Sequence, residues 1–314
     1  MSNPSKHINH NYSEETQEPE SVPFELLSCC VPLIRPSFDE EEIFQIYGTA
    51  FLYNHRGQQY LITAYHCVWD GVPEEYLQPI IGFQLDNNPH RAYIVESRRI
   101  PEDSWIRDKR FDCAILPIVI EDEIKEAILP QGINHNNVLV NKEIARRIRL
   151  EGHLLGYGEG RVQYTHQVRR EYLRDNGYDE REIDYLERRG YPTWIPYISK
   201  SYQFRVIEIN DLFWVATVGL EGFSGGPVIY YDAEQFFCIG MILSSRVIKA
   251  FNQDTESEEL YASGESKVVT MWRILGIIAQ SETDTILRIL RKGSTIVKID
   301  YTGKNRFRLT PTNH

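Results

Sequence analysis

A serine stands among glycines in the stretch Gly222-Phe223-Ser224-Gly225-Gly226-Pro227-Val228. Glycines at this density are typical of a backbone that needs positive φ angles or a close approach by a ligand. A serine held on such a turn is exposed, and neighbouring N–H groups can point at the group that it attacks. Ser224 is therefore a candidate nucleophile for acyl transfer, with an oxyanion hole beside it. The stretch alone is only moderately specific for this chemistry.

Two stretches upstream supply a candidate base and a candidate acid. His66 follows the strand-like run Gln59–Ala64 at the point where a loop begins, a position that often carries functional side chains. Asp112 stands at the start of the apolar run Cys113–Leu116. Taken singly, each has a plainer interpretation, because His66 could be a hydrogen-bonded core histidine and Asp112 a loop cap or surface charge. The order His, Asp, Ser along one chain favours a shared site.

Together the three stretches resemble the chymotrypsin/trypsin-like serine proteases. Leu61–Cys67 (LITAYHC) resembles the family pattern LTAAHC, Phe111–Leu116 (FDCAIL) resembles the DIALL strand, and Gly222–Pro227 (GFSGGP) resembles GDSGGP. The similarity covers about residues 40–250, with Gly156-Tyr157-Gly158 matching the family's GWG strand. Three motifs in one order are far more specific than any one of them.

The resemblance implies an all-β fold, a double six-stranded antiparallel β-barrel with the active site between the barrels. It also implies that Ser224 attacks the scissile carbonyl, that His66 takes and returns the proton, and that Asp112 orients the imidazole. The backbone N–H groups of Gly222 and Ser224 would form the oxyanion hole.

Four residues are implied to contact the substrate: Val218, Glu221, Ser244 and Ser245. Val218, six residues before the serine, occupies the primary specificity position and offers no counter-charge, so small or medium apolar P1 residues are expected. Glu221 lies at the expected pocket rim and could still reach a basic side chain. The strand Gly240–Ser245 would pair with the substrate backbone.

Two departures from the family pattern bear on regulation. Cys67 keeps the family's half-cystine beside the histidine, but the preceding strand has no cysteine to pair with it. Phe223 replaces the aspartate that receives a new N-terminus in the secreted digestive enzymes. Cleavage-dependent activation by that route is therefore not expected, and the motif is more similar to the bacterial housekeeping (HtrA-type) and viral members.

The composition of the 314 residues limits the function classes. A formal net charge of −11 argues against an electrostatic nucleic-acid binder. Five cysteines without CxxC spacing are interpreted as free thiols of a cytoplasmic protein, and neither a metal nor a cofactor is expected. The polar N-terminus is unlike a secretory signal, and no apolar run is long enough for a membrane span.

The pattern along the chain predicts four regions. They are a disordered tail at 1–22, a first barrel at 23–140, a second barrel at 141–250 with a charged helical insertion at 161–200, and a C-terminal helix/hairpin extension at 251–314. Within the extension, a helix is expected at Thr283–Lys292 and a hairpin at Thr295–Tyr301 and Phe307–Thr310.

The leading functional prediction is a serine endopeptidase that acts on protein or peptide substrates through an acyl-enzyme intermediate. A regulatory partner protein or the insertion would restrain it. Two alternatives stay open: a catalytically silent protease fold used for binding or sensing, because a fold alone does not fix a function, and hydrolysis of non-peptide esters by the same three residues.

Overall fold

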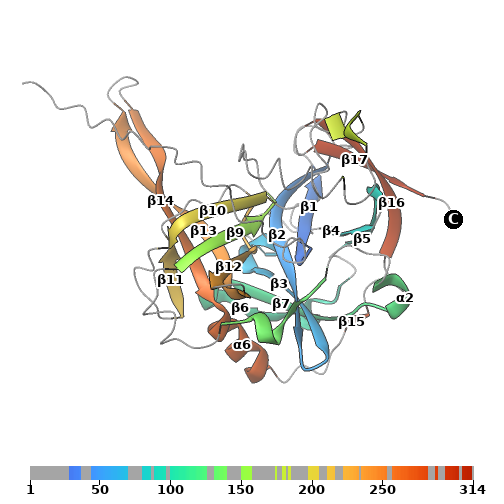
Figure 1. Ribbon diagram of the computed structural model, residues 1–314, viewed down its shortest axis with the longest axis horizontal. Coiled ribbons are helices and arrows are strands. Elements are labelled where there is room, and N and C mark those ends of the chain that lie inside the picture. The colour runs from blue at the N-terminus through green and yellow to red at the C-terminus, as the bar shows by residue number, and fades with distance from the viewer. Residues whose placement is uncertain are drawn as a thin grey trace, which may run out of the picture.

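The computed structural model contains two β-sheets and one helix of more than a single turn, α6, among the residues that it describes (Figure 1). The described residues are 28–36, 44–69, 80–85, 88–96, 100–125, 131–139, 150–157, 174, 179–181, 183–184, 197–204, 211–215, 222–232, 235–252, 257–281, 287–288, 294–303 and 306–312. The predicted tail at 1–22 and most of the predicted insertion at 161–200 lie outside them.

The first sheet is built around the hairpin of β2 (Phe44–His55) and β3 (Gln58–Ala64). The turn residues Arg56 and Gly57 both have positive φ, 50° and 82°, the backbone that a tight two-residue hairpin turn requires. The other members are β1 (Cys30–Pro36), β4 (Ile80–Leu85), β5 (Asn88–Glu96), β6 (Ile106–Asp108), β7 (Cys113–Val119), β8 (Ile133–Asn134), β15 (Leu287–Arg288), β16 (Ser294–Gly303) and β17 (Arg306–Pro311).

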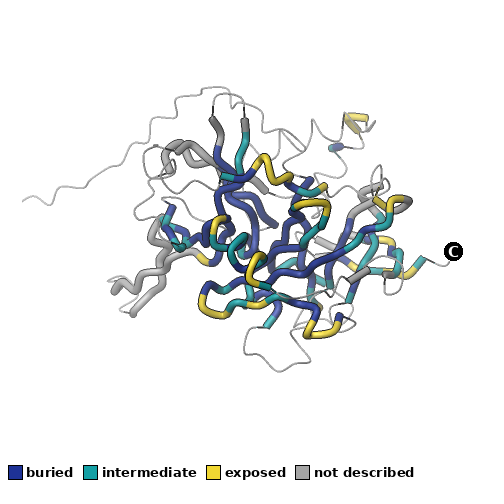
Figure 2. The backbone as a smooth tube through the Cα atoms, turned by 90° about the horizontal axis from the view of Figure 1, so that it is seen from below, coloured by how far each residue is buried: buried dark blue, intermediate teal, exposed yellow. Residues whose placement is uncertain are grey.

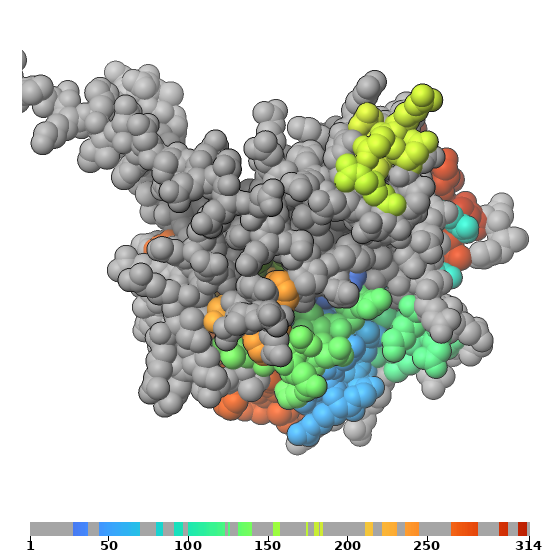
Figure 3. Space-filling view, in the orientation of Figure 1, coloured from blue at the N-terminus to red at the C-terminus, as the bar shows by residue number. Residues whose placement is uncertain are grey.

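These strands follow the path β1-β4-β5-β16-β17-β2-β3-β7-β15, with β6 on β7 and β8 on β2. Most pairs are antiparallel, but β15 on β7 and β8 on β2 are parallel. Figure 3 shows the tip of the β2–β3 hairpin beside segment 131–139 on one face of the molecule, as the β2–β8 pairing requires.

The second sheet has six strands in the order β10-β9-β12-β13-β14-β11. They are β9 (Leu150–Gly156), β10 (Tyr197–Phe204), β11 (Leu212–Val215), β12 (Pro227–Asp232), β13 (Gln235–Asn252) and β14 (Ser257–Thr270). All of its pairs are antiparallel. The outer halves of β13 and β14 project from the body as a two-stranded ribbon (Figure 1).

Two α-helices have bounds within the described residues, α6 (Met271–Gln280) and the single turn α2 (Asp122–Lys125), and the described residues 174, 180–181 and 183–184 are also helical. Thr270 caps α6, because its hydroxyl accepts a hydrogen bond from the N–H of Arg273 at 3.1 Å. Met271, Ile274 and Ile277 recur at helical spacing and are buried.

The C-terminal region differs from the prediction in two ways. The expected helix at Thr283–Lys292 is wrong for Leu287–Arg288, which form β15, and the helix lies earlier, at α6. The expected hairpin does form, as β16 and β17, but it is part of the first sheet, since β16 pairs with β5 and β17 with β2. Residues 251–314 are therefore not an appendage, and the first sheet has eleven strands rather than the six expected.

One apolar core joins the two sheets. Its largest cluster of buried side chains includes Leu61 and Ile115 of the first sheet together with Ile229, Met241 and Val269 of the second. Figure 2 shows buried backbone through the centre of the molecule and exposed residues at turns and at the outer ends of strands. The two sheets are thus packed against each other, and side chains at their junction are held by both.

No helix in the described part of the chain is long and apolar enough to cross a membrane.

Candidate active site

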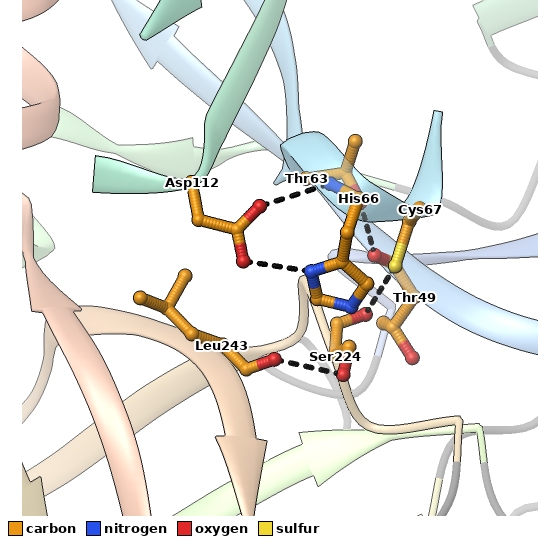
Figure 4. A network of polar contacts seen from close by, with 7 residues as sticks. All are labelled: Thr49, Thr63, His66, Cys67, Asp112, Ser224 and Leu243. Carbon is orange, nitrogen blue, oxygen red and sulfur yellow. Dashed lines mark hydrogen bonds and ion pairs between the residues drawn. The ribbon is translucent and has the colours of Figure 1, made fainter. Parts of the chain in front are cut away.

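His66 lies at the end of β3, in the 3₁₀ turn Tyr65–Cys67. Its ring Nδ1 is 2.7 Å from Oδ2 of Asp112, and its backbone N–H donates to Oδ1 of the same carboxylate at 2.9 Å. The N–H of Tyr65 donates to the Asp112 carbonyl at 3.0 Å. Three contacts to a single residue fix both the position and the rotation of the imidazole (Figure 4).

Asp112 stands directly before β7, which pairs with β3, so the sheet itself brings Asp112 to His66. Its backbone is left-handed, with φ 50° and ψ 49°, a conformation that aspartate and asparagine tolerate better than most residues. The preceding turn is capped by Asp108, whose carboxylate accepts from the N–H groups of Arg110 and Phe111 and contacts Arg273 at 3.1 Å.

The pair is partly buried, with side-chain exposures of 33% for His66 and 32% for Asp112. Burial acts to lower the pKa of His66, but the hydrogen bond to Asp112 and the adjacent Cys67 thiol raise it to about 10. Because the folded-state pKa is raised, the pair contributes fully to stability below the ordinary histidine pKa of about 6.5. That contribution is lost as the pH rises toward 10.

Ser224 lies in a turn that enters the second sheet at β12. Gly222 and Gly225 have positive φ angles of 88° and 86°, which other residues rarely adopt. The N–H of Gly225 donates to the Ile242 carbonyl at 2.7 Å, and the N–H of Gly226 to the Phe223 carbonyl at 2.8 Å. The glycine-rich sequence is therefore required by the geometry of the turn.

The turn also fits closely against β2 of the first sheet and β9 of the second. A Cβ atom at Gly225 would lie 2.0 Å from the Thr49 carbonyl oxygen, and one at Gly226 would lie 2.0 Å from the Leu155 carbonyl oxygen. The Ser224 carbonyl accepts from the N–H of Thr49 at 2.9 Å and from the Cys67 thiol at 3.6 Å. The nucleophile candidate is thus joined to the residue next to His66.

The Ser224 hydroxyl donates to the Leu243 carbonyl at 2.9 Å (Figure 4). Within the described residues it makes no hydrogen bond to His66, although Figure 4 shows the ring edge opposite Asp112 turned toward the side where Ser224 lies. A protonated imidazole has no lone pair to accept from a hydroxyl, so this resting arrangement agrees with the raised pKa of His66.

The two candidate oxyanion donors are the N–H groups of Gly222 and Ser224, on either side of Phe223. None of the described residues accepts a hydrogen bond from either of them. Their arrangement as a pair of oxyanion donors stays a prediction.

The predicted specificity residues are only partly placed by the structure. Ser244 and Ser245 lie on β13, directly after Leu243, and the Ser244 side chain is exposed. Val218 and Glu221 lie outside the described residues. The apolar P1 preference therefore stays a prediction.

Sequence reasoning missed Thr49 and Leu243. Thr49 makes hydrogen bonds to both sides of the serine turn, and Leu243 offers the carbonyl that holds the serine hydroxyl. Neither residue type signals such a role, because a threonine and a leucine inside β-strands are ordinary strand formers. Only pairing across 173 residues, from Thr49 to Gly222, shows the connection.

All five cysteines are free and buried, as predicted. Cys67 forms no disulfide, and Gly48 of β2, which lies against it, has no thiol. A Cβ atom at Gly48 would lie 3.0 Å from Sγ and 3.4 Å from Cβ of Cys67. These separations are close to those in a disulfide, where the Cβ of one cysteine lies about 3 Å from the sulfur of the other. The strand thus presents the right geometry for a bridge but lacks the second thiol.

We therefore expect Gly48→Cys to form a disulfide with Cys67 under oxidising conditions. Closing a loop of about 20 residues should raise the free energy of unfolding by about 3 kcal/mol. Thiol titration of the denatured, non-reduced protein checks the bond: the variant has six cysteines and should show four free thiols, against five in the parent. The double variant with Cys67→Ser is the control and should show five free thiols and no stabilisation; six free thiols in Gly48→Cys would contradict the geometry.

Among the described residues, no group of three or more His, Cys, Asp or Glu side chains is arranged to hold a metal ion.

Comparison with known proteins adds little to this geometry. No protein-family model and no curated protein matches the chain. Among solved structures, the crystal structure of AL20, a thermostable serine protease from an extremophilic microorganism, aligns with a TM-score of 0.45 and 9% identity. The alignment covers 83% of this chain and 100% of that chain. A TM-score this low does not establish a common fold, and 9% identity does not transfer an activity.

Proposed function

We propose that the protein is a serine endopeptidase with a chymotrypsin-like arrangement of its two sheets. The observation that carries the proposal is the junction of His66, Asp112 and Ser224, with Ser224 in a turn where no described residue accepts from the N–H of Gly222 or of Ser224. Each component comes from a different part of the chain, and the fold brings them together at the junction of the two sheets. An isolated His–Asp pair or an isolated glycine turn would not support this reaction class.

The proposed reaction uses these groups in turn. His66, once deprotonated, accepts the Ser224 hydroxyl proton, and the oxygen attacks the carbonyl carbon of the peptide bond. The oxyanion that forms is held by the N–H groups of Gly222 and Ser224. His66 then gives the proton to the departing amine, which leaves an acyl group on Ser224. Water, activated by His66, hydrolyses this ester and restores the hydroxyl.

The Ser224 hydroxyl must leave the Leu243 carbonyl before this reaction can begin. A rotation of the serine side chain toward His66 achieves this once the imidazole is neutral. The same carbonyl lies on β13, where an extended substrate backbone would pair, so substrate N–H groups compete for it. Binding of a peptide would thus favour release of the hydroxyl.

One observation favours a second candidate, a catalytically silent module that binds peptides. The Ser224 hydroxyl is bonded to Leu243 rather than to His66. A protein that kept the fold only for binding would need no bond between the serine and the histidine. In both candidates a partner protein would restrain or recruit the molecule.

An active-site-directed fluorophosphonate distinguishes the two candidates. We expect covalent labelling of wild type at Ser224, mapped by peptide mass analysis, because the reagent needs an activated hydroxyl and an oxyanion site. Ser224→Ala should not be labelled, whereas Ser294→Ala, a serine on β16 in the other sheet, should be labelled like wild type. If folded wild-type protein is not labelled, the serine endopeptidase proposal is rejected and the catalytically silent binding module remains.

A peptide-library digest then separates peptidase from esterase activity. Cleavage by wild type but not by Ser224→Ala supports the endopeptidase, and the residues found at P1 test the apolar preference. Labelling without cleavage of any peptide would instead favour ester hydrolysis.

A further inference from the structure

Thr49, a fully buried residue of β2, is bonded to the serine turn on both sides of Phe223. Its hydroxyl donates to the Gly222 carbonyl at 2.7 Å, and its N–H donates to the Ser224 carbonyl at 2.9 Å. The same hydroxyl accepts from the N–H of Tyr157 at 2.9 Å. One residue of the first sheet therefore joins the serine turn to the end of β9.

The direction of these bonds selects one orientation of the peptide between Gly222 and Phe223. A hydroxyl has a single proton, and the Tyr157 N–H already occupies one acceptor position of Thr49. If this peptide turned over, the Phe223 N–H would face the hydroxyl in place of the Gly222 carbonyl. The hydroxyl would then meet two donors and lose its acceptor in a buried place, which is unfavourable.

Phe223 holds the other face of the turn. Its side chain is fully buried in the second apolar cluster, with Leu154, Val228 and Ile242. Gly156 leaves room for it, because a Cβ atom there would lie 2.9 Å from the Phe223 Cα. The turn is thus held by an aromatic side chain on one side and by the threonine hydroxyl on the other, without any ion pair at position 223.

We propose that Thr49 is a positioning residue for the oxyanion donors; this role rests on the proposed function. Thr49 holds the carbonyls of Gly222 and Ser224, and the donor N–H groups of the same two residues lie in the peptide units directly before those carbonyls, so Thr49 restrains the donors through the shared Cα atoms. Electrostatic stabilisation of an oxyanion depends on donors that are fixed before the reaction begins. The Thr49 hydroxyl, which belongs to the first sheet, fixes the conformation of the serine turn. A freed N-terminus is therefore not required to order this turn.

Thr49→Val tests the role, because valine has nearly the shape of threonine and lacks only the hydroxyl. We expect kcat to fall by about tenfold to hundredfold, with KM changed less than about threefold, since the donors act mainly in the transition state. The affinity for a peptide boronate that mimics the tetrahedral state should fall by the same factor as kcat/KM. Thr49→Ser keeps the hydroxyl and should recover most of kcat.

Thr270→Val is the matched control. It also removes a threonine hydroxyl that is bonded to a backbone group, the cap of α6, and among the described residues this hydroxyl makes no hydrogen bond to the turn 222–226. This variant should lower the melting temperature and leave kcat unchanged. If Thr49→Val loses kcat only in proportion to the unfolded fraction, as a general stability effect would require, the positioning role is overturned.

Amide hydrogen exchange provides a readout that needs no activity. The N–H of Gly225 is bonded to the Ile242 carbonyl on β13, and that of Gly226 to the Phe223 carbonyl within the turn. Both should exchange at least about tenfold faster in Thr49→Val than in wild type or Thr270→Val. Unchanged exchange and unchanged kcat would overturn the proposal. Wild type that resists fluorophosphonate would reject the proposed function, and faster exchange in Thr49→Val would then still support the hold of Thr49 on the turn.

Discussion

Replacing Asp112 with asparagine is expected to lower kcat/KM for peptide hydrolysis by about 10⁴ at neutral pH. The asparagine amide would face Nδ1 of His66 with a donor where the carboxylate accepts, so the imidazole would take the wrong tautomer. Asparagine tolerates the left-handed backbone of this position, and its carbonyl oxygen can still accept from the His66 N–H. The fold should therefore survive, and the loss reports on chemistry.

The pH profile gives an independent signature of the same pair. Wild-type kcat/KM should rise with pH through a midpoint between about 6.5 and 10, because His66 must lose its proton to act as a base. In Asp112→Asn the hydrogen bond that raises this pKa is lost, so the midpoint should move down toward 6.5. Asp108→Asn, on the same loop, is the control and should keep the wild-type profile. An Asp112→Asn enzyme within tenfold of wild type would show that Asp112 does not orient His66.

Gly225→Ala is expected to have the largest effect on folding of any single methyl addition in the serine turn. The added Cβ would lie 2.0 Å from the Thr49 carbonyl oxygen and 2.3 Å from the Thr63 hydroxyl, on a backbone with φ 86°. Left-handed strain and overpacking together should lower the free energy of unfolding by roughly 3–5 kcal/mol. Denaturant titration measures this loss, and activity should disappear as the turn moves away from Thr49.

Gly57→Ala separates the two causes. Gly57 has nearly the same φ, 82°, but a Cβ atom there would meet nothing within 4 Å. Its loss should be only about 1–2 kcal/mol, from backbone strain alone. The difference between the two variants measures the clash at the turn, and equal losses would mean that the contact with Thr49 has no energetic weight.

The sequence predicted the candidate catalytic residues better than the residues that hold them in place. His66, Asp112 and Ser224 lie in short stretches that resemble the motifs of one protease family, so they could be recognised together from the sequence. Thr49 could not, because its role depends on which carbonyl lies opposite it after the sheets have packed. Ser224 shows the same limit, since its bond to Leu243 depends on the rotation of one side chain.

For the fold as well, local structure was predicted from the sequence and long-range strand pairing was not. Alternating apolar runs predicted a β-rich chain and the final hairpin, because strand formation is largely local. They did not predict that this hairpin completes the first sheet, since partner choice between distant strands leaves no local trace. The helix at Met271–Gln280 did leave a signal in the sequence, a threonine cap followed by apolar residues at helical spacing, which the prediction of a helix at Thr283–Lys292 missed.

The position of the final hairpin sets the time at which the molecule can be completed during synthesis. In the first sheet Phe44 pairs with Phe307, and Ile94 pairs with Thr295. At a translation rate of about 5–20 residues per second, roughly 10–50 s separate the synthesis of Phe44 from that of Phe307. Throughout that interval the edges of β2 and β5 that later receive β17 and β16 have no native partner. A nascent chain interrupted before β16 would therefore carry His66 and Asp112 in a first sheet that still lacks β16 and β17.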